Sequence, residues 1–351
     1  MIFMPTTTPV KGRDSYFDNA KFILIFLVVF GHLMQSYITE YASIRVLYIY
    51  VYTFHMPAFI LISGFFAKNF RKPGYITKTM KKLILPYVFF QCIYSIFYYF
   101  LLGKSSFSIQ LFAPEWSLWF LLSLFFWNIM LIGFAKLSAR YAMPIAIVIG
   151  LVAGYFNQID GYLSLSRTFV FFPFFLAGFY LTKQHFQYLQ TKLAKWIGAG
   201  VIIAIVSFII AHPALNENWF LGSKPYANFL DNRTLGVFIR LFVYAISFAS
   251  ISAFFSFVPK RQLFFTKWGK NTLYVYLLHG FFIKLFREGS VQTVDYKLQT
   301  IFLLMAISLG LTIILSSKVV TTIVQPVIEL RFSKIRNMFT KWAGRFQKQS
   351  Y

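Results

Sequence analysis

Three histidines lie inside long apolar stretches of the chain. His32, His55 and His279 stand about 12, 10 and 9 residues from one end of their stretches, roughly 14 to 18 Å deep at about 1.5 Å per residue. Ionisable groups are costly at that depth of a bilayer and usually serve a function. A neutral imidazole there could remove a proton from a hydroxyl group or accept an acyl group. Three histidines at one depth predict a shared polar pocket, although a single buried histidine can simply join two helices by hydrogen bonds.

The elements that must hold these histidines are apolar stretches of about 20 residues, long enough to cross roughly 30 Å of hydrocarbon. Of the 351 residues, 58% are hydrophobic and 13% are charged, which excludes an ordinary soluble domain. The sequence predicts an all-α, polytopic transmembrane bundle of about ten helices, in one membrane domain over residues 1–323. The predicted spans are 20–38, 45–66, 82–102, 117–135, 141–157, 167–182, 196–212, 234–257, 270–287 and 298–319.

Lysine and arginine residues are concentrated in alternate loops. With the N-terminus inside, 25 of the 34 Lys and Arg residues fall in cytoplasmic segments, so both termini are predicted to be cytoplasmic. This pattern explains the net charge of +24 without a nucleic-acid partner. The basic, amphipathic segment 324–351 is predicted to be a cytoplasmic tail lying on the anionic inner leaflet. The single cysteine, Cys92, permits no intrachain disulfide, and no Cys/His spacing predicts a metal site.

Four lysines are candidates for binding a phosphorylated cosubstrate at the cytoplasmic side. Lys21 precedes His32 by 11 residues and therefore lies on nearly the same helix face. Lys78, Lys81 and Lys82 are spaced i, i+3 and i+4, so they form one patch if the third span begins early. Such a patch could hold phosphate groups. Equally, Lys21 could extend to lipid head groups, and the patch could only mark the inner side of the membrane.

At the outer side, the candidates for contacting a polar substrate are Glu115, Trp119, Arg167 and Arg240. Their side chains could meet the hydroxyl or carboxylate groups of a glycan, or the arginines could pair with nearby acidic residues. Trp116 is expected to be an anchor at the membrane interface, where tryptophan is enriched.

Five short segments occur in a characteristic order over most of the chain. They are Phe17-Asp18-Asn19-Ala20-Lys21 through Val28-Val29-Phe30-Gly31-His32; Phe54-His55-Met56-Pro57 with Ser63-Gly64-Phe65; Lys81-Lys82 through Pro86-Tyr87; Leu118-Trp119-Phe120-Leu121; and Leu273-Tyr274-Val275-Tyr276-Leu277-Leu278-His279. The ordered set resembles acyltransferase family 3, the integral-membrane O-acyltransferases, and particularly its fucose 4-O-acetylase-like branch.

The resemblance implies transfer of an acyl group, usually acetyl, from cytosolic acetyl-CoA to a hydroxyl of an extracytoplasmic or lipid-linked glycan. It implies a multi-pass protein of the bacterial cell membrane, with acyl-CoA as cosubstrate, no permanently bound cofactor, and glycan-assembly proteins as further candidate partners. The family's essential histidine corresponds to His32 and its basic partner to Lys21, where arginine is common. Many members carry a glutamate pair in the fourth-span motif, whereas the corresponding stretch here reads Trp119-Phe120-Leu121-Leu122, which removes one candidate acid or base.

On this hypothesis His32 is the general base or transient acyl acceptor, while His55 and His279 orient it or polarise the thioester carbonyl. Lys21, Lys78, Lys81 and Lys82 would then bind coenzyme A. Two alternatives stay open on the sequence alone. One is a polysaccharide exporter or lipid-linked glycan flippase without acyl transfer, and the other is a structural partner of a glycan-assembly complex.

Overall fold

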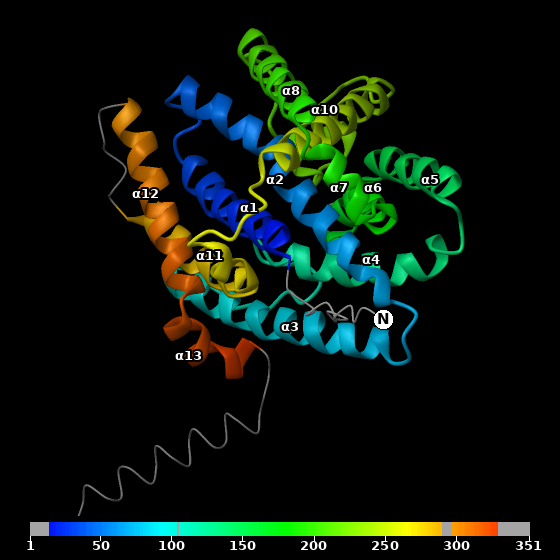
Figure 1. The fold of residues 1–351 in the computed structure, drawn as a ribbon. Helices are drawn as coiled ribbons and strands as arrows, with labels where there is room; N and C mark the ends of the chain where they lie inside the picture. The colour runs from blue at the N-terminus through cyan, green and yellow to red at the C-terminus, as the bar shows by residue number, and fades with distance from the viewer. Residues whose placement is uncertain (1–13, 104, 160, 290–296, 329–351) are drawn as a thin grey trace, which may run out of the picture.

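The computed structural model describes residues 14–103, 105–159, 161–289 and 297–328 (Figure 1). These residues form helices, turns and loops, and none of them lies in a strand. The α-helices are α1 (Ser15–Met34), α2 (Ala42–Phe66), α3 (Tyr75–Leu101), α4 (Trp119–Phe134), α5 (Ala139–Val152), α6 (Leu165–Tyr180), α7 (Lys183–Leu189), α8 (Lys192–Ala211), α9 (Asn218–Leu221), α10 (Leu235–Phe257), α11 (Thr272–Glu288), α12 (Lys297–Ser316) and α13 (Lys318–Ile328). Short 3₁₀ turns occupy Ala67–Asn69, Ala153–Tyr155, Asn157–Ile159, Tyr162–Ser164, Tyr226–Asn228 and Thr266–Lys270.

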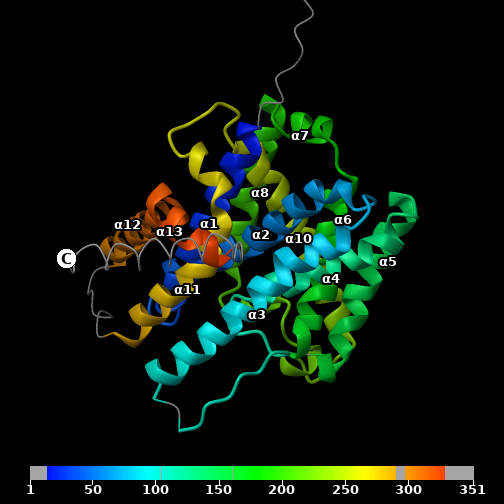
Figure 2. The ribbon, with the colours of Figure 1, turned by 90° about the horizontal axis from the view of Figure 1, so that it is seen from below.

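The centre of the bundle is formed by α1 and α2. Both run through the middle of the molecule, with α12 at one edge and α5 at the other (Figures 1 and 2). Helix α2 packs most extensively against α6, and it does so through glycines. A Cβ on Gly64 would lie 1.9 Å from the carbonyl oxygen of Phe175, and one on Gly178 would lie 1.9 Å from that of Leu61. Small residues that allow backbones to approach closely are typical of helix packing in membranes.

Side-chain contacts tie together chain segments that lie on the same predicted side of the membrane. On one side, Asn19 Nδ2 donates to the carbonyl oxygens of Pro259 and Arg261, and Lys68 donates to that of Leu181. On the other, Arg45 contacts the connection after α8 and Arg287 contacts the end of α1. These contacts agree with long helices that alternate in direction, as the charge pattern predicts. The choice of the cytoplasmic side stays a prediction.

Each of the ten predicted spans coincides with one helix, and most boundaries agree within a few residues. Among the described residues, seven helices are long and apolar enough to cross a membrane. Two further apolar helices, Trp119–Phe134 and Ala139–Tyr155, are shorter. The chain thus has an all-α, multi-pass architecture, while the count of ten crossings stays a prediction. Helix α13 continues past residue 323 to Ile328, and the rest of the predicted basic tail lies outside the described residues.

The largest boundary difference concerns α3, which begins at Tyr75 rather than at 82. The hydropathy pattern ends at the first lysines, whereas the backbone hydrogen bonds continue for almost two more turns. Lys78, Lys81 and Lys82 are therefore helical and exposed, and their spacing places them on one face as the sequence predicts.

Candidate active site

His32 lies in the last turn of α1, which ends at Met34. The sequence places it halfway along a span over 20–38; that position is wrong, because α1 begins five residues earlier and ends four residues earlier. The side chain is half-buried and lines a cavity. Its Nδ1 atom is buried and has no hydrogen-bond partner within the described part of the chain. His32 is thus a partly enclosed imidazole that opens onto an internal space.

His279 is the buried neighbour of His32. The two ring centroids are 5.6 Å apart, although α1 and α11 are far apart in the sequence. Nδ1 of His279 lies 2.8 Å from the carbonyl oxygen of Tyr276 and 3.0 Å from that of Val275. Since a carbonyl only accepts, Nδ1 carries the proton of a neutral ring and Nε2 keeps its lone pair. This contact brings together two of the three histidines for which the sequence predicts a shared pocket, although His279 is not among the residues that line the cavity beside His32.

Trp116 packs against both of these histidines. Its ring centroid is 4.4 Å from that of His32 and 5.3 Å from that of His279. The indole is half-buried, packs against the core and lines the cavity, while its expected position at the membrane interface stays a prediction. Its backbone has φ of 39°, a conformation that is rare for bulky residues and that clusters at functional sites. A Cβ on Gly280 would lie 2.7 Å from the indole, so the glycine makes room for it.

The segment that leads into α4 is held by side chains of α3 and α11. The Gln91 amide donates to the carbonyl oxygens of Gln110 and Ala113 and accepts from the backbone N–H of Glu115. The Tyr276 hydroxyl donates to the carbonyl oxygen of Ser117 at 2.5 Å. These contacts fix the backbone on both sides of Trp116, and they explain how its unusual conformation is maintained.

His55 occupies the middle of α2, where it is 2% exposed. Its Nδ1 lies 2.9 Å from the carbonyl oxygen of Val51, which leaves Nε2 as the acceptor of a neutral ring. The ring of Tyr52 lies 4.5 Å away in an edge-on arrangement. His55 lines the same cavity as His32.

This cavity, the histidine pocket, has a volume of about 170 Å³. Its wall combines imidazoles, tyrosines, tryptophans, one amide and one guanidinium with apolar side chains, and no carboxylate is among the described residues that line it. The lining residues are Val28, His32, Gln35, Tyr48, Tyr52, His55, Met56, Trp116, Ser117, Trp119, Arg167, Phe171, Phe220, Leu221 and Tyr276. Aromatic faces with a few convergent polar groups are typical of small-molecule sites.

A second cavity, the apolar pocket, adjoins the first and measures about 180 Å³. The two share Val28, Met56 and Tyr276 in their walls. Apart from Ser63, Thr272 and Tyr276, the described residues around the apolar pocket are hydrophobic; they are Ile25, Val28, Met56, Phe59, Phe120, Leu124 and Leu273. The pocket lies between α1, α2, α4 and α11 and leads away from His32 toward the start of α11 and the end of α2.

Arg287 connects the last turn of α11 to the end of α1. One of its Nη atoms donates to the carbonyl oxygen of His32 and to Oε1 of Gln35, both at 2.7 Å. Its guanidinium also lies 5.7 Å from the centre of the Trp116 ring. From the sequence alone, Arg287 counts only as a charge at the end of a span. The signal that could have found it is its position two turns after His279 on the same helix.

Two of the four predicted outer-side residues lie in the histidine pocket. Trp119 stacks on Phe171, and the Arg167 guanidinium lies 4.9 Å from the centre of the Trp119 ring. Arg240 is 1% exposed and does not line the pocket; it packs behind α9 instead. Glu115 is half-buried next to Trp116 and is not among the pocket residues.

The four predicted lysines lie outside both cavities. Lys21 forms an ion pair with Asp18 at 2.8 Å, three turns below His32 on α1. Lys78, Lys81 and Lys82 are exposed on the first turns of α3. In the same part of that helix, the Tyr75 hydroxyl donates to Oδ1 of Asn128 on α4 at 2.6 Å. Asn128 follows Leu124 of the apolar pocket by one turn, so the start of α3 contacts α4 one turn beyond a residue that lines that pocket.

The sequence identifies the class of protein that carries this site. Residues 14–319 match acyltransferase family 3, described as an acyltransferase domain. The chain therefore belongs to this family, and its long apolar helices indicate a multi-pass membrane protein. Among the described residues, no group of His, Cys, Asp and Glu side chains could hold a metal ion.

Individual relatives match shorter parts of the chain. Nodulation protein NolL of Sinorhizobium fredii is 32% identical over 162 residues, which cover 40% of this chain and 43% of that protein. Nodulation protein NolL of Mesorhizobium japonicum is 44% identical over 62 residues, or 17% of either chain. The matched segments thus span less than half of both curated relatives. No solved structure matches the chain.

Proposed function

We propose that this protein is an O-acetyltransferase that moves an acetyl group from cytosolic acetyl-CoA to a hydroxyl group of an extracytoplasmic or lipid-linked glycan. A base removes the proton of the acceptor hydroxyl while its oxygen attacks the thioester carbonyl. The new C–O ester bond forms, the C–S bond breaks, and the base returns the proton to the coenzyme A thiolate. Each step needs one proton carrier of moderate basicity, which is the role that imidazole performs well.

The observation that carries the proposal is the group of His32, His279 and Trp116, of which His32 and Trp116 line the histidine pocket. Their rings lie 4.4 to 5.6 Å from one another, centre to centre. His32 is the member of this group whose imidazole opens onto the pocket, so we assign it the base. His279 is fully enclosed and keeps an Nε2 lone pair, which suits a group that orients the base rather than one that meets the acceptor.

The donor side is supported by the apolar pocket and the lysine patch. The pocket continues from the wall of the histidine pocket toward the start of α11 and the end of α2, and Lys78, Lys81 and Lys82 are exposed on the first turns of α3. An acyl thioester is largely apolar, whereas the nucleotide part of coenzyme A carries several phosphate charges. We therefore place the thioester arm in the apolar pocket and the phosphates at the patch, with lysine acting as a point charge.

The acceptor side is supported by the composition of the histidine pocket. Tyrosine hydroxyls, the Gln35 amide and Arg167 can hydrogen-bond sugar hydroxyls, while Trp116 and Trp119 offer flat faces to the C–H side of a ring. Of its lining residues, Gln35, Arg167, Phe220 and Leu221 lie at the predicted outer ends of helices or in an outer connection. A glycan could thus meet a donor that enters from the opposite side, close to His32.

The experiment that tests the proposal compares surface glycans from cells with wild-type protein, a deletion, His32→Ala and His185→Ala at matched protein levels. We expect mass spectrometry to show loss of O-acetyl groups in the deletion and in His32→Ala, with unchanged glycan abundance. His185→Ala is the control, because that residue pairs with Thr182 at a helix start far along the chain from the site. Loss of the glycan itself, with unchanged acetylation per sugar, would instead identify an exporter.

A further inference from the structure

The connection between α8 and α10 supplies one wall of the histidine pocket. It contains α9, whose Phe220 and Leu221 both line the pocket. Most of the other lining residues belong to the long helices of the bundle, where a substitution also changes the packing of the core. Phe220 and Leu221 stand instead on a four-residue helix at the predicted outer end of the bundle, where Phe220 is 5% exposed and Leu221 packs against the core.

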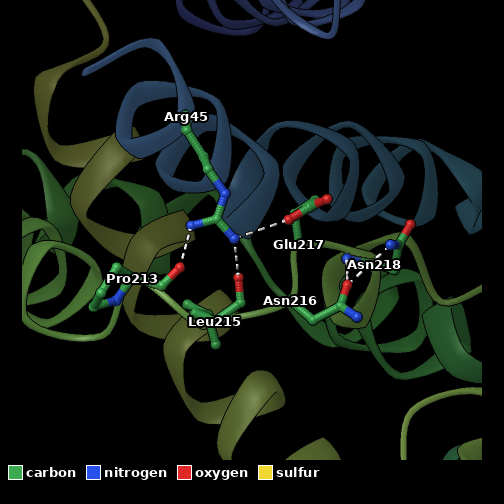
Figure 3. Close-up of polar contacts among 6 residues, drawn as sticks. All are labelled: Arg45, Pro213, Leu215, Asn216, Glu217 and Asn218. Atoms are coloured by element: carbon green, nitrogen blue, oxygen red, sulfur yellow. Dashed lines mark hydrogen bonds and ion pairs between the residues drawn. The ribbon is translucent and has the colours of Figure 1, made fainter. Parts of the chain in front are cut away.

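The first part of this connection is held by Arg45, at the start of α2 (Figure 3). Its guanidinium donates to the carbonyl oxygens of Pro213 and Leu215, at 2.5 and 2.6 Å. It also pairs with the Glu217 carboxylate at 3.3 Å. Next to these contacts, Asn216 Oδ1 accepts the backbone N–H of Asn218 and so begins α9. A planar fork with fixed donors can bridge two carbonyls in this way, whereas an ammonium group cannot do so with the same geometry.

The second part is held by α6 and α10. Ser166 donates to the carbonyl oxygen of Gly222 at 2.9 Å, and Arg167 Nε donates to that of Leu221 at 3.3 Å. Arg240, 1% exposed, donates to the carbonyl oxygen of Trp219 at 3.3 Å. Gly222 ends α9 with φ of +61°, a conformation that favours glycine.

Five backbone carbonyls of the segment 213–222 therefore receive hydrogen bonds from side chains of three long helices. A segment fixed through its main chain keeps its path when its own side chains change. Conservative changes of its side chains at positions 220 and 221 can then alter the pocket wall while the main chain keeps its path, and both side chains line the pocket. This is the arrangement expected of an element that sets selectivity rather than one that performs chemistry.

We propose that the segment 213–222 is the acceptor-selectivity element of the enzyme. Phe220 and Leu221 contact the acceptor sugar and determine which sugars fit, and Arg45 is a positioning residue that acts through the segment. This inference rests on the proposed function, because it assigns the acceptor to the histidine pocket. It adds that an apolar face of the sugar packs on Phe220 and Leu221 while its hydroxyl groups point toward His32 and Gln35.

The test uses the full-length protein in lipid nanodiscs with ¹⁴C-acetyl-CoA and two kinds of acceptor. One is the host's own surface glycan after mild alkaline removal of its esters, and the other is a panel of p-nitrophenyl hexosides and deoxyhexosides. We expect Phe220→Ala to change the relative rates among acceptors by at least about tenfold, the size expected from reshaping an apolar pocket. The KM for acetyl-CoA should stay the same. Phe238→Ala, a highly exposed position on α10, is the control and should keep the wild-type preference.

Arg45→Lys separates positioning from a general structural role. If Arg45 holds the segment, the variant should raise the KM for the acceptor and shift the preference in the same direction as Phe220→Ala, with acetyl-CoA KM unchanged. A uniform loss of rate with every acceptor would contradict this role. If Phe220→Ala elutes as aggregate in size-exclusion chromatography, Phe220→Leu and Leu221→Val give the same comparison with smaller changes of volume.

The two hypotheses fail in different ways. The proposed function would be overturned if the wild-type protein transferred acetyl to no acceptor, which is the result expected only of His32→Ala. A different result would overturn the selectivity element alone. In that case the wild-type activity is lost in His32→Ala, but every variant of Phe220 and Leu221 keeps the wild-type relative rates among acceptors.

Discussion

The imidazole rings of His32 and His279 lie 5.6 Å apart, centre to centre, on two helices from opposite ends of the chain. Trp116 closes the third side of the group, and Arg287 on the helix of His279 binds the backbone carbonyl of His32. The position of His32 is therefore determined by α11 as well as by its own helix. A substitution on α11 can change catalysis without altering any group that meets the substrate.

We predict that His279→Ala lowers kcat by about 10²-fold, at the lower end of what a proton-transfer group contributes, because it removes the neighbour that orients His32. His32→Ala should lower kcat further, by about 10³-fold or more. Acetyl transfer by purified protein measures both. His279→Gln should recover part of the rate, since an amide can fill the space and still accept a hydrogen bond. Equal losses in Ala and Gln variants would mean that the imidazole itself carries out a step.

We predict that Arg287→Lys lowers kcat by about 10- to 100-fold and leaves the KM for acetyl-CoA unchanged. The substitution weakens two hydrogen bonds from a charged group, each worth about 1.5 to 3 kcal/mol, and so loosens the end of α1 that carries His32. Steady-state kinetics with both substrates provide the measurement. Arg140→Lys, at an exposed position, is the matched control and should have no effect. A rise in acetyl-CoA KM would instead place Arg287 in the donor site.

We predict that Lys81→Glu raises the KM for acetyl-CoA at least about tenfold while the KM for the acceptor is unchanged, because a carboxylate repels the coenzyme phosphates. Titration of each substrate at a saturating concentration of the other measures this. The difference from wild type should shrink at high salt, since exposed charges are screened. Lys195→Glu, an exposed lysine on the same predicted side, is the control. If both variants behave alike, general surface charge rather than the patch attracts the donor.

Hydropathy and charge predict the long helices because the cost of exposing a polar backbone to lipid is large. Each predicted span is a helix, and the lysines before the third span form the expected patch. The ends are less accurate, since a helix can continue into the aqueous interface where hydropathy no longer marks it. Helix α3 therefore begins seven residues before the predicted start, and His32 lies at the end of α1 rather than at its middle.

The residues of the site are predictable where their type is rare in the chain and hard to find where it is common. Three histidines within apolar stretches are conspicuous in this chain, and Trp119 stands in a recognisable segment. Tyr48 and Tyr52 are two of 22 tyrosines, and neither their number nor their spacing distinguishes them. Trp116 is expected at the interface because tryptophan usually lies there. Helix α9 has four residues, too few for any periodic pattern, and its role depends on contacts from distant helices.

The packing of α2 on α6 gives a prediction about folding. We predict that Gly64→Ala costs more than about 3 kcal/mol of stability, because its Cβ would lie 1.9 Å from the carbonyl oxygen of Phe175, and backbone cannot move aside as a side chain can. Gly178→Ala should behave in the same way against Leu61. The measurement is the thermal midpoint of the detergent-solubilised protein, together with the monodisperse fraction in size-exclusion chromatography. Gly133→Ala is the control, since no neighbouring atom lies within 4 Å of the methyl group that it would add, and it should match the wild type. Normal stability of Gly64→Ala would mean that α2 and α6 pack less closely than their backbones indicate, and His55 on α2 would then no longer be fixed beside the histidine pocket.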